Sequence, residues 1–201
     1  MENVVVSIFH IESEAFQAFS ELKQFVQTEN TKLAQASIVK AENGVVNVKD
    51  SFDLMNSLGD GYFEGGLIGS LIGILGGPLG VLFGFATGGA IGASVGSDKE
   101  LINSALITTV SKKLTNGEVA IIALVQENDE SVLNAIFEKY QVDIARWDVA
   151  TVAAEIESAL KIQKDLEHQA KARLIADKKE ARREKFDKLK ASIKEKFSKK
   201  N

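Results

Sequence analysis

Residues 65 to 97 read GGLIGSLIGILGGPLGVLFGFATGGAIGASVGS, and their glycine spacing is the strongest structural signal in the sequence. No residue between Glu64 and Asp98 is charged. Every fourth residue is a glycine in two successive registers, Gly65, Gly69, Gly73 and Gly77, then Gly80, Gly84, Gly88, Gly92 and Gly96. Because an α-helix has 3.6 residues per turn, each register places its glycines on one helix face, where a second helix can approach closely. The spacing predicts two helical arms packed through their glycines.

Pro78, the only proline of the chain, lies between these arms. Its missing N–H and fixed φ end one helix and suit the first turn of the next, so we expect a glycine-zipper helical hairpin over residues 56–97 that turns at Pro78. Large apolar residues fill the positions between the glycines and suit either lipid or a protein core. A glycine in a water-exposed helix costs about 1 kcal/mol relative to alanine, so the nine glycines require close packing in return.

The sequence leaves the surroundings of this hairpin open. A helix that crosses a bilayer needs about 20 apolar residues. The first arm, between Glu64 and Pro78, is shorter than that, whereas the second arm, residues 79–97, comes close. We expect a spanning or a re-entrant hairpin with both ends on one side of a membrane. The alternatives are a hairpin buried in a soluble assembly and a disordered glycine-rich loop.

Strand and helix patterns precede the hairpin. They predict a strand at residues 3–9, a helix at 13–28, and two strands at 33–42 and 45–52. Asn43-Gly44 joins these last two strands, and this dipeptide tolerates the positive φ values of a tight β-hairpin turn.

Further elements follow the hairpin. Ser97 and Glu100 have capping-box spacing at the start of a predicted helix that runs from Leu101 to Leu114, and Asn116-Gly117 would end it. The patterns after it predict a strand at residues 119–125, a helix at 132–137 and a strand at 142–149.

The order of these elements predicts an α+β fold, a ferredoxin-like sandwich in which helices cover one face of a mixed sheet. From about Thr151 onward the chain has no glycine or proline, which predicts a long, largely exposed helix. We therefore expect a body at residues 1–55 and 98–150, the hairpin at 56–97, and a charged, basic C-terminal helix at 151–201.

The net charge of −4 combines an acidic body with a basic tail. Residues 1–160 carry 9 Lys+Arg and 21 Asp+Glu, a net of −12, and residues 161–201 carry 15 and 7, a net of +8. An acidic body is unsuited to nucleic acid, whereas the tail suits a polyanion such as an anionic membrane leaflet. The absence of cysteine and of a secretory signal favours the cytoplasmic side of the cell.

The tail contains a basic amphipathic pattern. Phe186, Leu189, Ile193 and Phe197 form one apolar stripe, and lysines that include Lys190 and Lys194 surround it. This pattern is typical of a helix on an anionic membrane surface. A solvated helix and a coiled coil between subunits remain alternatives.

The sequence offers little chemistry. His10 and His168 match no metal-ligand spacing, the glycine block lacks the residues that define a nucleotide-binding loop, and Ser70 lies within the glycine register rather than on a nucleophile elbow. We predict that the chain is not an enzyme and has no catalytic, metal-binding or cofactor-binding residues, no cofactor and no small-molecule substrate.

The order of the parts resembles a bacterial family, the domain of unknown function 1269, whose members are predicted membrane proteins. The resemblance covers roughly residues 3–155 and rests on the opening strand and helix, the glycine block, and the strand Val119-Ala-Ile-Ile-Ala-Leu-Val with the helix and strand after it. It implies a membrane-associated hairpin on a small α/β body and carries no known activity, cofactor or catalytic residue. The basic tail departs from the family pattern.

These observations predict a non-enzymatic, membrane-associated protein with a structural or stress-related role. Its hairpin would anchor or oligomerise the chain, with the body and tail in the cytoplasm and with lipid and further copies of itself as partners. The alternative is a cytoplasmic homo-oligomer whose hairpins pack between subunits.

Overall fold

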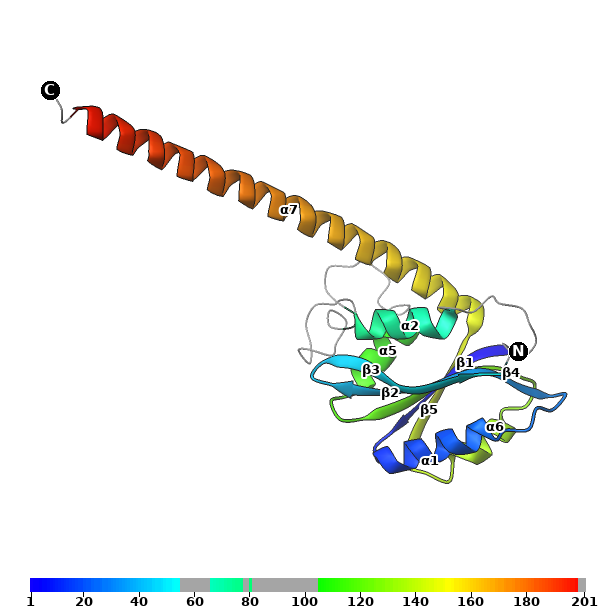
Figure 1. The fold of residues 1–201 in the computed structure, drawn as a ribbon. Helices are drawn as coiled ribbons and strands as arrows, with labels where there is room; N and C mark the ends of the chain where they lie inside the picture. The colour runs from blue at the N-terminus through cyan, green and yellow to red at the C-terminus, as the bar shows by residue number, and fades with distance from the viewer. Residues whose placement is uncertain (55–65, 78–79, 81–104, 199–201) are drawn as a thin grey trace. The chain divides into compact units, whose positions relative to one another are not determined.

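The computed structural model describes residues 1–54, 66–77, 80 and 105–198, with only the backbone at residues 176, 181 and 184 and from residue 186 onward (Figure 1). The described chain divides into two compact units, Met1–Leu160 and Lys161–Asn201. Several predicted hairpin residues lie outside the described residues, namely Gly65, Pro78, Gly84, Gly88, Gly92 and Gly96.

The first unit is built on one five-stranded sheet with the order β3-β2-β4-β1-β5. Its strands are β1 (Glu2–Phe9), β2 (Thr31–Glu42), β3 (Val45–Asp53), β4 (Val119–Glu127) and β5 (Val142–Asp148). Every pairing between these strands is antiparallel, so the prediction of a mixed sheet is wrong. The reason is that β4 lies between β1 and β2, and these two strands, which a helix connects along the chain, never pair with each other.

The predicted β-hairpin at Asn43-Gly44 is confirmed. Asn43 has a φ of 55° and Gly44 a φ of 77°, which are the left-handed values that a two-residue hairpin turn requires. β2 and β3 pair across this turn, with Glu42 opposite Val45.

Helices α1 (Glu12–Lys23) and α6 (Ser131–Phe137) cover one face of the sheet (Figure 1). Their core includes Phe9 and Phe137, whose rings meet edge to face at 6.1 Å. Helix α1 ends at Lys23, so the prediction that it continues to residue 28 is wrong. Instead the Gln27 side chain hydrogen-bonds both the N–H and the C=O of Leu33, which turns the chain into β2.

Helices α2 (Leu67–Gly76) and α5 (Leu106–Lys113) cover the opposite face (Figure 1), so the expectation of helices on one face only is also wrong. Val5 and Phe9 belong to the core under α1 and α6, and alternate residues of a strand point to opposite faces. Val4, Val6 and Ile8 therefore face the side of α2 and α5, where all three are buried.

The C-terminal helix is confirmed as α7 (Val149–Ser198). Its first turns belong to the first unit, where Val152, Ile156 and Ala159 are buried. Helix α5 starts at Leu106, because Ala105 before it is extended with ψ 136°. The predicted helix from Leu101 to Leu114 is therefore confirmed from Leu106 onward, whereas residues 101–104 and the predicted cap at Ser97 and Glu100 lie outside the described residues.

Candidate functional site

The first arm of the predicted hairpin forms α2, and this helix has two contrasting faces. Five of its branched residues lie against the body, each no more than 8% exposed, namely Ile68, Leu71, Ile72, Ile74 and Leu75. Gly69 and Gly73 are exposed on the other face, and no described atom lies within 4 Å of a Cβ built at either one. In the described chain the apolar face of this arm thus meets a protein core, while its glycine face is open.

The glycines at the end of α2 are in tight surroundings instead. A Cβ at Gly76 would lie 2.7 Å from the carbonyl oxygen of Val46 in β3, so only glycine lets the helix end approach this strand. A Cβ at Gly77 would lie 2.7 Å from the Gly73 carbonyl oxygen, and one at Gly80 would overlap the Leu75 carbonyl. Gly76 stands outside both four-residue registers, which is why the sequence pattern did not identify it.

The start of α5 is capped by a residue far away in the chain. The Glu155 carboxylate in α7 accepts the backbone N–H groups of Leu106 at 3.0 Å and Ile107 at 3.2 Å. Burial raises the pKa of Glu155 above its usual 4.5, and the two hydrogen bonds act in the opposite direction. A carboxylate at this position satisfies amides that the helix leaves without partners and faces the positive end of the helix dipole. Glu155 therefore holds the beginning of α5 on the body.

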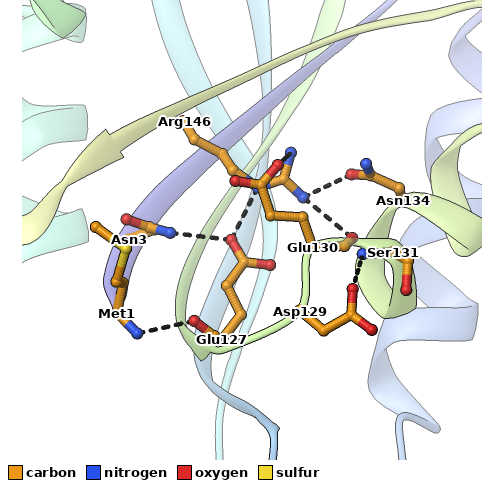
Figure 2. A network of polar contacts seen from close by, with 8 residues as sticks. All are labelled: Met1, Asn3, Glu127, Asp129, Glu130, Ser131, Asn134 and Arg146. Carbon is orange, nitrogen blue, oxygen red and sulfur yellow. Dashed lines mark hydrogen bonds and ion pairs between the residues drawn. The ribbon is translucent and has the colours of Figure 1, made fainter.

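A network of polar contacts surrounds Glu127 and Arg146 (Figure 2). Glu127 Oε1 accepts the Arg146 Nε–H at 2.8 Å and the Asn3 side-chain amide at 3.1 Å, and the Glu127 side chain is 1% exposed. Arg146 also donates to Asn134 Oδ1 at 2.6 Å and lies 3.5 Å from the Glu130 carboxylate. The cluster joins β1, β4, β5 and α6. Its geometry is that of a buried ion pair that fixes strand register.

The two histidines have different surroundings. His10 Nδ1 lies 2.9 Å from Glu118 Oε1, and the other oxygen of Glu118 accepts the Thr115 N–H at 2.6 Å, so this group ties the end of β1 to the loop before β4. His168 is exposed on α7. No group of three or more His, Asp or Glu side chains in the described residues could hold a metal ion.

The predicted tail residues all lie on α7, whose backbone is helical through Ser198. Upstream of them, Leu166, Leu174 and Ile175 are 43% to 68% exposed. Within the part of the chain that the structure describes, no helix combines the length and the apolar character that a bilayer crossing needs.

Comparison with known proteins gives one match. The model of a family described as a protein of unknown function (DUF1269) matches residues 62–166, just over half of the chain. The match contains α2, α5, β4, α6, β5 and the start of α7, whereas the opening strand and helix lie outside it. No curated protein and no solved structure matches the chain.

Proposed function

The chain belongs to the DUF1269 family of proteins of unknown function, and we propose that it is a non-enzymatic protein that attaches to a membrane through the segment between α2 and α5. Residues 77–105 connect α2 to α5, and the part of this connecting segment that we propose to insert is residues 81–104, of which 81–97 are uncharged and largely apolar.

The proposal rests on the positions of α2 and α5 on the body. Helices α2 and α5 pack on the same face of one sheet, within a single compact unit (Figure 1). Gly76 touches β3 at the end of α2, and Glu155 holds the beginning of α5. A chain that leaves from one of these points and returns to the other starts and ends on the same side of any membrane that it enters.

Chain length then restricts the mode of attachment. Two complete crossings need about 40 residues, and the connecting segment, residues 77–105, has 29. The residues of α2 cannot extend it into lipid, because their apolar side chains are buried against the body. The attachment is therefore re-entrant, with the second arm as the part that contacts lipid, and the body projects into the cytoplasm.

The architecture of the body supports a role as a rigid support for this segment. The order β2-β4-β1-β5, with α1 and α6 on one face, supports a ferredoxin-like sandwich to which β3 adds an edge strand. The opposite face of such a sandwich is free to hold α2 and α5.

Membrane fractionation tests the proposal. The expressed full-length chain is pelleted with membranes and washed with high salt and then with alkaline carbonate, beside a variant with Phe83→Asp and Phe85→Asp. We expect the unmodified chain to stay in the pellet through both washes and the variant to be released, because two carboxylates in the apolar segment oppose insertion.

The matched control carries Val45→Asp and Val48→Asp on the edge strand β3, where both valines are exposed. This control should stay in the pellet. Release of the unmodified chain by salt, or equal release of the two variants, would overturn insertion through residues 81–104.

The open glycine face of α2 favours a second candidate, a soluble assembly in which Gly69 and Gly73 receive a helix of another copy. It predicts a stable oligomer in detergent-free buffer. Gly73→Leu should dissociate that oligomer, whereas Gln17→Leu on the exposed side of α1 should leave it intact. A monomer in detergent-free buffer would exclude this candidate.

A further inference from the structure

We infer that the last turns of α7, residues 184–198, form a second and independent membrane contact that recognises anionic lipid headgroups. This contact does not depend on attachment through residues 81–104. It follows from how residue types are distributed around a helix whose backbone is regular through Ser198.

The apolar stripe of this segment is narrow and unbroken. At about 100° per residue, Phe186, Leu189, Ile193 and Phe197 lie within an arc of about 80°. A stripe of this width suits shallow burial at the boundary between headgroups and acyl chains.

Lysines lie on both sides of the stripe. Lys185 and Lys196 flank one edge, and Lys190 and Lys194 flank the other. Long basic side chains at such borders can lay their methylene stems along an apolar layer and keep their charges among anionic headgroups.

The acidic residues of the segment are kept away from the stripe. Glu184, Asp187 and Glu195 lie about 120° to 200° around the helix from its centre. A planar anionic surface would contact the stripe and the lysines and leave these carboxylates in water. A protein groove that wrapped around the helix would meet them.

The same distribution opposes a coiled coil between two copies of α7. In a two-stranded coiled coil, the positions beside the apolar seam face their counterparts on the partner helix. Here both borders are basic, so lysine would face lysine in the parallel and in the antiparallel arrangement. The charges therefore favour lipid over self-association as the occupant of the stripe.

Vesicle co-sedimentation tests this inference on the full chain carrying Phe83→Asp and Phe85→Asp, which removes the proposed insertion. Binding is compared between phosphatidylcholine vesicles and vesicles that contain about 30% phosphatidylserine. We expect binding only to the anionic vesicles, with an affinity that decreases as salt increases.

The decisive pair of variants removes two charges from the same helix. Lys190→Gln with Lys194→Gln should weaken binding about 25-fold, at about five-fold per basic residue. Lys164→Gln with Lys171→Gln, at exposed positions farther from the C-terminus, removes the same charge and should have little effect. Equal losses in the two variants, or equal binding to both kinds of vesicle, would overturn the inference. So would an oligomer that Ile193→Gln dissociates.

Discussion

The carboxylate of Glu155 accepts the backbone N–H of Leu106 at 3.0 Å, across 49 residues of sequence. Glu155 lies in the part of α7 that belongs to the first unit, and it caps α5 through this bond. Ala105, directly before α5, has no side-chain group that could serve as the cap. The beginning of α5 is thereby coupled to the C-terminal helix.

Removal of this cap should destabilise the body. We expect Glu155→Ala to lower the free energy of unfolding by about 1 kcal/mol, as loss of a helix cap typically does. Urea unfolding at neutral pH measures the change, and Glu157→Ala, which removes an exposed carboxylate two residues later, is the matched control. Equal effects of the two substitutions would contradict the capping role.

Stability should also depend on pH through Glu155. Its pKa in the folded protein is raised above 4.5, so the folded state binds more protons than the unfolded state between 4.5 and the raised pKa. The free energy of unfolding contributed by this group is therefore largest below pH 4.5 and is lost as pH rises through the raised pKa. Measured from pH 4.5 to 7, the stability of the unmodified chain relative to Glu155→Gln should decrease as pH rises. A constant difference would refute this coupling.

The buried pair of Glu127 and Arg146 should tolerate joint replacement better than the loss of one member. Arg146→Met leaves a buried carboxylate without its cation and should cost about 3 kcal/mol in urea unfolding, whereas combining it with Glu127→Leu should recover most of that loss. The comparison is Lys113→Met, which breaks an exposed pair with Asp143 and should cost less than about 1 kcal/mol. A double variant no more stable than Arg146→Met would show that the pair itself is needed.

Two glycines of α2 should respond in opposite directions to alanine. Gly76→Ala places a methyl group 2.7 Å from the Val46 carbonyl oxygen and should destabilise the body by about 1–3 kcal/mol. Gly73→Ala meets open space and should stabilise the helix by up to about 1 kcal/mol. Thermal unfolding of both variants gives the sign. A destabilising Gly73→Ala would mean that another helix covers this face.

Local signals accounted for the elements that the sequence predicted. Asn43-Gly44 specified its turn because both residues adopt positive φ readily, and the β-branched run before Phe9 specified β1. The absence of glycine and proline after Thr151 likewise predicted α7. Each of these patterns acts within a few residues of itself.

Elements that depend on distant partners were missed or misplaced. Val26 continued the helical spacing of α1 yet is 79% exposed, because the bonds of Gln27 to β2 end the helix earlier. No pattern in the neighbouring sequence identifies Gly76 or Glu155. Gly76 is required by its close approach to β3, and Glu155 by its hydrogen bonds to α5. The strand order could not be predicted from local patterns either, because β4 lies between β1 and β2, two strands from the beginning of the chain.

That central position of β4 sets an order of events during translation. Glu2 of β1 pairs opposite Gln126, so the ribosome must complete β4 before either β1 or β2 gains the neighbour that joins them. Residues 65–97 precede β4 and leave the ribosome while the sheet is still divided. The apolar residues of this stretch are therefore exposed on the nascent chain before the complete sheet, on which α2 and α5 pack, can form.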